Sequence, residues 1–194
     1  TYYFATKELS GDGIFVDENN NVIINKNGRH YQLFSINNFC EVAYHNVLNI
    51  LASSLACWLL GERNDNILKS LKSFKYAPFR QEKIVNKLGI NIINDSKATN
   101  LGATLSAIKS NSKDVTLLVG GRGKNEEYSL LFSEKFCPQN IVAYGECADE
   151  FMKSAFKCGY KNITKTKAFK DAVKMAVNKT SLGGTLLFSP ACSS

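Results

Sequence analysis

Seven residues at positions 94–100 combine side chains that bind small anions and hydroxyl groups. They read Asn-Asp-Ser-Lys-Ala-Thr-Asn, between an apolar run at 90–93 and a helical pattern at 101–108. A segment that leaves a strand and enters a helix lies beside unpaired N–H groups and the positive end of the helix dipole. The sequence therefore predicts an anion-binding site. The alternative is that Thr99 or Asn100 is only the N-cap of the helix.

Two other polar segments follow predicted strands. One is Gly-Gly-Arg-Gly-Lys at 120–124, and the other is Ser-Pro-Ala-Cys-Ser-Ser at 189–194. The glycine loop fits neither GxGxxG nor the Walker A pattern, so we interpret it as a flexible turn that presents Lys124. Cys192 has no histidine in its motif, so we do not expect it to be a catalytic cysteine. Because the carboxyl ends of parallel strands share one edge of a sheet, we expect the three segments to converge.

Alternating strands and helices must position these segments. We expect strands at 84–88, 90–94, 115–119, 141–144, 161–164 and 185–188, and helices at 99–109, 128–136, 148–158 and 169–179. This alternation predicts an α/β fold, with a Rossmann-like, mainly parallel sheet covered on both faces.

The first part of the chain has another pattern. Residues 14–36 alternate apolar and polar around Asn and Gly turns, which predicts two or three short antiparallel strands. Helices are expected at 43–60 and 64–74. The first of these helices carries Asn46 and Asn49 away from its apolar stripe, where the amides either bond neighbouring loops or bind a ligand.

Pro78 marks the expected domain boundary, because proline disfavours helix in the preceding residue and stiffens the chain. We predict one domain at 1–77, a hinge at 78–82 and a second domain at 83–194.

Composition excludes several classes of protein. The 194 residues include 44% hydrophobic residues, yet no apolar run of the roughly 18 residues that a membrane helix needs, so we expect no membrane partner. The net charge is +7, but the lysines are scattered without interleaved aromatics, so we expect no nucleic-acid partner. Six cysteines without CxxC spacing indicate reduced thiols in the cytoplasm, with neither a zinc site nor a disulfide framework.

Four ordered motifs resemble those of the Mur ligase family, most closely the members that add D-glutamate. They are the stretch at 94–100, His-Asn-x-x-Asn-x-Leu-Ala at 45–52, the glycine loop at 120–124, and Ser-Pro-Ala-Cys-Ser-Ser at 189–194, which is similar to the family's Ser-Pro-Ala-Cys-Ala-Ser. A Pro-Phe-Arg-Gln-Glu segment at 78–82 also resembles the family's Pro-His-Arg-x-Glu linker, with Phe79 in place of histidine. Arg122 stands where those ligases frequently have aspartate.

This resemblance implies the incomplete C-terminal part of a central P-loop-type ATPase domain, followed by a Rossmann-like C-terminal domain that lacks its last helix. The first residue is not Met, which also suggests a fragment. The implied D-glutamate-binding residues are Lys97, Thr99, Lys124 and Ser194. The implied nucleotide-binding residues are Asn46, Asn49, Arg80 and Asp95. Neither catalytic residues nor metal ligands are expected in this chain.

The implied reaction joins D-glutamate to UDP-N-acetylmuramoyl-L-alanine through an acyl phosphate, with ATP converted to ADP and with Mg²⁺ held by the full-length enzyme. We expect a cytoplasmic monomer, and a fragment that is inactive alone. The alternatives are another Mur ligase, a folylpolyglutamate synthetase, or a noncatalytic module that binds adenine nucleotide.

Overall fold

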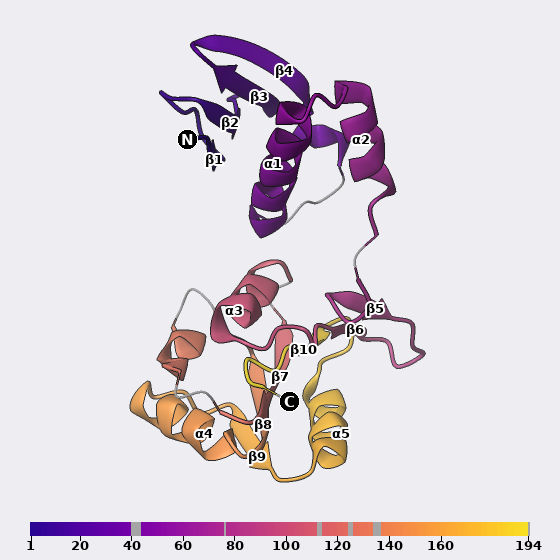
Figure 1. The fold of residues 1–194 in the computed structure, drawn as a ribbon. Helices are drawn as coiled ribbons and strands as arrows, with labels where there is room; N and C mark the ends of the chain where they lie inside the picture. Colours follow the sequence, from indigo (N-terminus) through magenta and orange to yellow (C-terminus); the bar gives the residue numbers. More distant parts are fainter. Residues whose placement is uncertain (40–43, 76, 112–113, 124–125, 134–136, 194) are drawn as a thin grey trace. The chain divides into compact units, whose positions relative to one another are not determined.

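The structure is a computed structural model of residues 1–194. It describes all of them except 40–43, 76, 112–113, 124–125, 134–136 and 194. The chain divides into two compact units, Thr1–Lys75 and Tyr76–Ser194, which are described separately (Figure 1).

The first unit contains a four-stranded sheet. Its strands, in the order in which they pair, are β1 (Tyr3–Ala5), β2 (Gly13–Val16), β3 (Asn21–Lys26) and β4 (Arg29–Ser35). The last three strands pair antiparallel, as predicted. Asn27 and Gly28 both have positive φ, 53° and 73°, which a tight hairpin turn requires. Strand β1 pairs parallel with β2 and was not predicted, because its sequence, Tyr-Phe-Ala, lacks the alternation that identifies a half-buried strand.

Two helices complete this unit. Helix α1 (Tyr44–Leu59) and helix α2 (Asn64–Ser73) match the predicted ranges closely, and a short 3-10 helix η1 (Ile36–Asn38) precedes them. Side chains of α1 and α2 join those of the sheet in one apolar core, whose buried members are Ile14, Val22, Ile24, Leu33, Phe34, Leu51, Leu55 and Ile67. Burial of these side chains holds the helices on the sheet.

The second unit contains a six-stranded sheet. Its strands, in spatial order, are β5 (Glu82–Ile84), β6 (Asn91–Asn94), β10 (Thr185–Phe188), β7 (Val115–Gly121), β8 (Asn140–Gly145) and β9 (Ile163–Thr166). All neighbours pair parallel except β5 and β6. The predicted α/β class with a mainly parallel sheet is confirmed. The last strand in sequence lies between β6 and β7.

Helices cover both faces of this sheet (Figure 1). They are α3 (Leu101–Lys109), the 3-10 helix η2 (Tyr128–Phe132), α4 (Ala148–Lys157) and α5 (Phe169–Lys179). Leu117 packs in one core with side chains of α3, η2 and α4, whereas Leu118 packs in another with α5. Adjacent residues of β7 are thus buried on opposite faces, as in a strand covered on both sides.

Three predicted boundaries were wrong. The strand at 84–88 lies instead at Glu82–Ile84, because Asn86 starts a turn: its amide donates to the carbonyls of Ile84 and Ile90. The strand at 161–164 begins two residues later. The helix expected at 128–136 is a 3-10 helix that ends at Phe132, and residues 134–136 lie outside the described part.

Candidate functional site

Backbone hydrogen bonds bring the three polar segments together at the carboxyl edge of the parallel strands. The N–H of Ala191 donates to the carbonyl of Ala98 at 3.0 Å, and the N–H of Gly120 donates to Pro190 O at 3.0 Å. Arg122 and Ser193 exchange two hydrogen bonds, of 2.8 and 3.1 Å. The predicted convergence of the segments is therefore confirmed, with residues 189–193 in contact with both other loops.

The two adjacent glycines of the middle loop permit this close approach. A Cβ on Gly121 would lie 2.3 Å from the carbonyl oxygen of Ser193, and one on Gly120 would lie 2.1 Å from that of Tyr144. The φ values of Gly120 and Gly121 are 141° and 134°, which residues with a side chain rarely adopt. Any larger residue would push the neighbouring segments apart.

Asp95 anchors the first loop. It is only 5% exposed, and its carboxylate accepts hydrogen bonds from the N–H of Gln81 at 3.2 Å and the hydroxyl of Ser189 at 3.1 Å. Thr104, which is fully buried, donates to the carbonyl of Ser189 at 3.3 Å. The Ser189 hydroxyl also lies 3.0 Å from the hydroxyl oxygen of Thr104, so its single proton is shared between Thr104 and Asp95.

The N-terminus of α3 already has two partners. Asn100 is its N-cap, with its side-chain oxygen accepting from Ala103 N–H at 2.9 Å. The carboxylate of Glu126 accepts from Leu101 N–H at 2.8 Å. A protein anion thus lies where the sequence predicts anion binding. Glu126 was missed because it is 25 positions from Leu101 and no local pattern links them.

The structure describes two of the four predicted D-glutamate-binding residues. Lys97 is exposed and Thr99 is half-buried, both in the loop that precedes α3. Lys124 and Ser194 lie outside the described residues, although each directly follows a segment of this edge. Their roles stay predictions.

The predicted nucleotide-binding residues belong to different units. In the first, helix α1 carries Asn46, which is half-buried, and Asn49, which is exposed. In the second, Arg80 is exposed and Asp95 is buried as described above. Their roles likewise stay predictions.

The backbone around Arg80 is unusual. Its neighbours Phe79 and Gln81 have φ of 66° and 48°, a left-handed conformation that non-glycine residues adopt at a cost of about 1–3 kcal/mol each. Three hydrogen bonds hold this conformation: Lys97 N–H donates to Phe79 O at 3.2 Å, Gln81 N–H donates to Asp95, and Phe79 N–H donates to the Glu82 carboxylate at 3.0 Å. The loop at 94–100 therefore fixes the backbone that presents Arg80.

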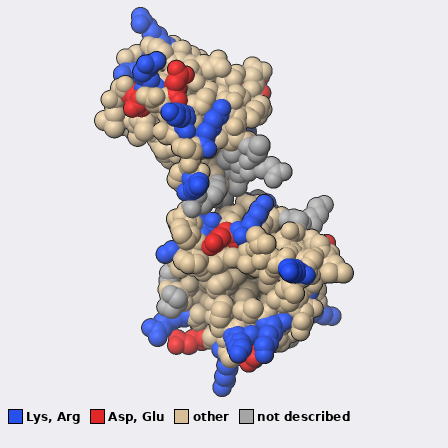
Figure 2. All heavy atoms as spheres, turned by 90° about the vertical axis from the view of Figure 1, so that its right-hand side faces the viewer, with Lys and Arg blue, Asp and Glu red and all other residues tan. Residues whose placement is uncertain are grey.

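Arg122 is paired at the surface of the same edge. Its Nε lies 3.4 Å from a carboxylate oxygen of Glu146, and both side chains are exposed. On the face that Figure 2 shows, basic side chains occur on both units with acidic ones among them. An exposed pair of this kind contributes little to stability, about 0–1 kcal/mol.

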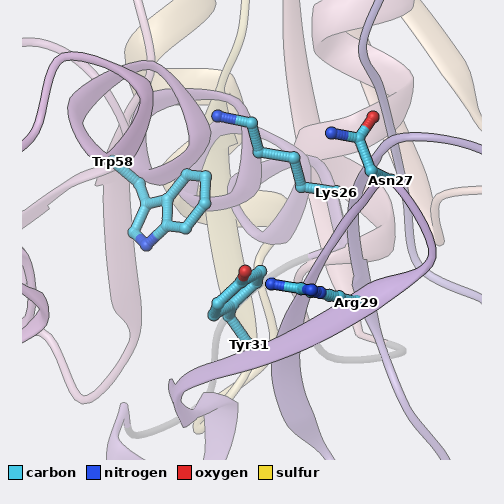
Figure 3. Close-up of a pocket in the computed structure, with 5 residues that line it drawn as sticks. All are labelled: Lys26, Asn27, Arg29, Tyr31 and Trp58. Atoms are coloured by element: carbon cyan, nitrogen blue, oxygen red, sulfur yellow. The ribbon is translucent and has the colours of Figure 1, made fainter.

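A hollow of about 420 Å³ lies in the first unit (Figure 3). It is lined by Lys26, Asn27, Arg29, Tyr31 and Trp58. The Tyr31 and Trp58 rings are 5.3 Å apart, and the Lys26 ammonium lies 5.4 Å from the centre of the Trp58 ring. Cation–π attraction therefore already engages Lys26. None of the five residues was predicted to bind a ligand.

Neither a metal-binding cluster nor a membrane-spanning helix occurs among the described residues. They contain no group of three or more His, Cys, Asp or Glu side chains placed to hold a metal ion. Within the same described part of the chain, no helix has the length and apolar character needed to cross a membrane.

Comparison with known proteins reveals relatives over nearly the whole chain. The UDP-N-acetylmuramoylalanine–D-glutamate ligase of Alkaliphilus metalliredigens is 30% identical over 195 residues, which cover 99% of this chain and 42% of the relative. The ligase of the same name from Chlorobaculum parvum is 37% identical over 153 residues, 77% of this chain and 32% of the relative. The chain therefore spans less than half the length of these relatives. No family model matches it.

Solved structures share the fold. The UDP-N-acetylmuramoylalanyl-D-glutamyl-2,6-diaminopimelate–D-alanyl-D-alanyl ligase of Acinetobacter baumannii has a TM-score of 0.64 at 20% identity, over 96% of this chain and 42% of that one. A MurF ligase of Thermotoga maritima in complex with ADP has a TM-score of 0.59 at 19% identity, over 92% and 45%. The folylpolyglutamate synthase of the same organism has a TM-score of 0.52 at 18% identity, over 88% of this chain and 41% of that one.

Proposed function

We propose that this chain, a relative of the Mur ligases over nearly its whole length, is the C-terminal portion of an ATP-dependent ligase that adds D-glutamate to UDP-N-acetylmuramoyl-L-alanine in the cytoplasm. The observation that supports this most is the joining of the three polar segments by backbone hydrogen bonds at one sheet edge. In open α/β sheets, ligands bind at this edge.

The edge is proposed to bind the amino-acid substrate. D-Glutamate carries two carboxylates, which need fixed cations and hydrogen-bond donors. Lys97 and Lys124 would supply the charge, and Thr99 and Ser194 would supply hydroxyl donors. Holding the substrate amine beside the activated acyl carbon replaces a bimolecular encounter with an oriented reaction. These residues therefore bind and orient the substrate, and none of them is assigned a step in bond making.

The adenine nucleotide is proposed to contact Asn46, Asn49, Arg80 and Asp95. An ionised carboxylate such as that of Asp95 acts only as an acceptor, which suits a ribose hydroxyl. The guanidinium of Arg80, an exposed side chain, suits the charge of a nucleotide.

ATP supplies the phosphoryl group that activates the muramoyl carboxyl group. Mg²⁺ is proposed to be held by the full-length enzyme outside this chain, and no step is derived through it. The proposed domains are the tail of the central ATP-binding domain at 1–77 and the C-terminal domain at 83–194, joined by the linker at 78–82.

Binding measurements on the full-length protein that contains this chain test the proposal. Lys97→Ala should weaken D-glutamate binding about tenfold to hundredfold, the equivalent of one charge-assisted hydrogen bond of about 1.5–3 kcal/mol, and leave ATP binding unchanged. The matched control is Lys109→Ala, an exposed lysine in the last turn of α3, which should change neither affinity. Titration calorimetry gives both constants. Equal losses for D-glutamate and ATP would contradict the assigned role, and preferential binding of another amino acid would contradict the substrate.

A further inference from the structure

Two buried thiols meet at the carboxyl edge of the sheet. The Sγ atoms of Cys147 and Cys192 are 3.0 Å apart, although the residues are 45 positions apart in the sequence. Cys147 directly precedes α4, and Cys192 lies in the segment that follows β10. Each residue is 1% exposed. The other described cysteines, at positions 57, 137 and 158, are all exposed, so this pair has a distinct environment.

One loop holds both cysteines in place. The N–H of Cys147 donates to the carbonyl of Gly121 at 3.2 Å, and the next residue of that loop, Arg122, exchanges two hydrogen bonds with Ser193. The same loop therefore holds Cys147 through Gly121, and it holds the neighbour of Cys192, Ser193, through Arg122. A disulfide has an S–S bond of about 2.05 Å, so bond formation requires the sulfurs to approach by only about 1 Å.

The surroundings of the pair favour ionisation of Cys192. The hydrogen bond with the Cys147 thiol lowers the pKa of Cys192, and the hydroxyl of Tyr128, 3.3 Å from its sulfur, lowers it further, against the effect of burial. The same contact, together with burial, raises the pKa of Cys147. The thiolate is the reactive form of cysteine, so Cys192 is the attacking sulfur and Cys147 the second one.

We propose that Cys147 and Cys192 form a modification site, at which a small peroxide produces a reversible intramolecular disulfide. The thiolate of Cys192 attacks one oxygen of hydrogen peroxide, the O–O bond breaks, and hydroxide leaves to give a sulfenic acid. The sulfur of Cys147 then attacks the sulfenic sulfur, the S–O bond breaks, and the leaving oxygen departs as water after protonation. Two thiols are oxidised, and one peroxide is reduced to two waters.

The burial of the pair decides which oxidant can act. A bulky disulfide cannot approach sulfurs that are 1% exposed, whereas hydrogen peroxide is about the size of two water molecules and needs only a small local opening. The proposal does not depend on the ligase activity. The bond would connect the segment at 189–193 to the start of α4 and so restrain the edge at which we place the amino-acid substrate.

Peptide mapping of the protein that carries this chain tests the proposal. The reduced protein is treated with hydrogen peroxide, its remaining thiols are alkylated, and its digest is analysed by mass spectrometry. The expected product joins the peptides of Cys147 and Cys192, is lighter by two hydrogen atoms, and disappears on treatment with dithiothreitol. Cys158→Ser, at an exposed cysteine, is the matched control and should leave the joined peptide unchanged. In Cys147→Ser, the sulfenic acid of Cys192 should become trappable by dimedone.

Two outcomes would overturn the proposal. One is oxidation of the exposed cysteines, or of Cys192 to a sulfinic acid, without any joined peptide from the unsubstituted protein. The other is a joined peptide that forms between chains, which a mixture of isotopically labelled and unlabelled protein would reveal by crossed masses. Because both measurements use the unsubstituted protein, a variant that fails to fold does not affect them.

Discussion

The buried carboxylate of Asp95 should contribute to the stability of the second unit through the hydrogen bonds that it accepts from Gln81 and Ser189. Gln81 N–H and the Ser189 hydroxyl lie 3.2 and 3.1 Å from its oxygens, in a residue that is only 5% exposed. In Asp95→Asn the side chain keeps its size, but one oxygen becomes an NH₂ group that cannot accept a hydrogen bond. Either the Gln81 N–H or the Ser189 hydroxyl then faces the new NH₂ group, which is itself a donor.

The expected cost follows from the type of bond that is lost. A hydrogen bond to a charged group contributes about 1.5–3 kcal/mol, so Asp95→Asn should lower the free energy of unfolding of the second unit by about that amount. Ser189→Ala removes the same contact from the other side, together with the 3.0 Å hydrogen bond from its hydroxyl to Thr104, which keeps the Ser189 carbonyl as its own acceptor. The double variant should therefore lose less than the sum of the single variants, by about 1 kcal/mol or more.

Denaturation with two probes can isolate this effect. The chain contains a single tryptophan, Trp58, in helix α1 of the first unit, so its fluorescence follows that unit, whereas far-UV circular dichroism follows both. Asp95→Asn should move the dichroism transition of the second unit to lower urea and leave the fluorescence transition unchanged. Additive losses in the double variant, with a coupling below about 0.5 kcal/mol, would refute the assigned hydrogen bond.

Three further predictions concern the same unit. Gly121→Ala should destabilise it by more than about 2 kcal/mol in urea denaturation, because the new Cβ would lie 2.3 Å from the backbone oxygen of Ser193; a neutral effect would contradict the close approach. Glu126→Gln should cost about 0.3–1 kcal/mol at the α3 N-terminus, with the loss reduced in high salt; a salt-independent loss would exclude the dipole explanation. The hydrogen bond and charge of Lys165 lower the pKa of Asp149, so this pair stabilises the fold above the ordinary pKa of 3.8, and the effect disappears as pH falls through the lowered pKa. In Lys165→Gln, NMR titration should show the pKa of Asp149 closer to 3.8, and an unchanged value would rule out Lys165 as the cause.

Local patterns in the sequence predicted much of the fold. The observed helix Phe169–Lys179 and strand Thr185–Phe188 coincide with the predicted ranges, because their apolar residues repeat with the periods of a helix and a strand. The alternation of such elements also predicted a parallel sheet, and hence one edge for all three polar segments. Where the pattern was weak, as at 84–88 and 128–136, the prediction of the element was wrong.

The contacts that build the edge depended on the tertiary structure. Asp95 and Ser189 are 94 positions apart, Cys147 and Cys192 are 45 apart, and Leu101 and Glu126 are 25 apart. The first two contacts arise because the last strand, β10, inserts between β6 and β7 and brings its following segment to the two other loops, whereas the third joins the start of α3 to the loop after β7. The order of strands in a sheet depends on which faces pack together across the whole unit, and no local period in the sequence encodes it.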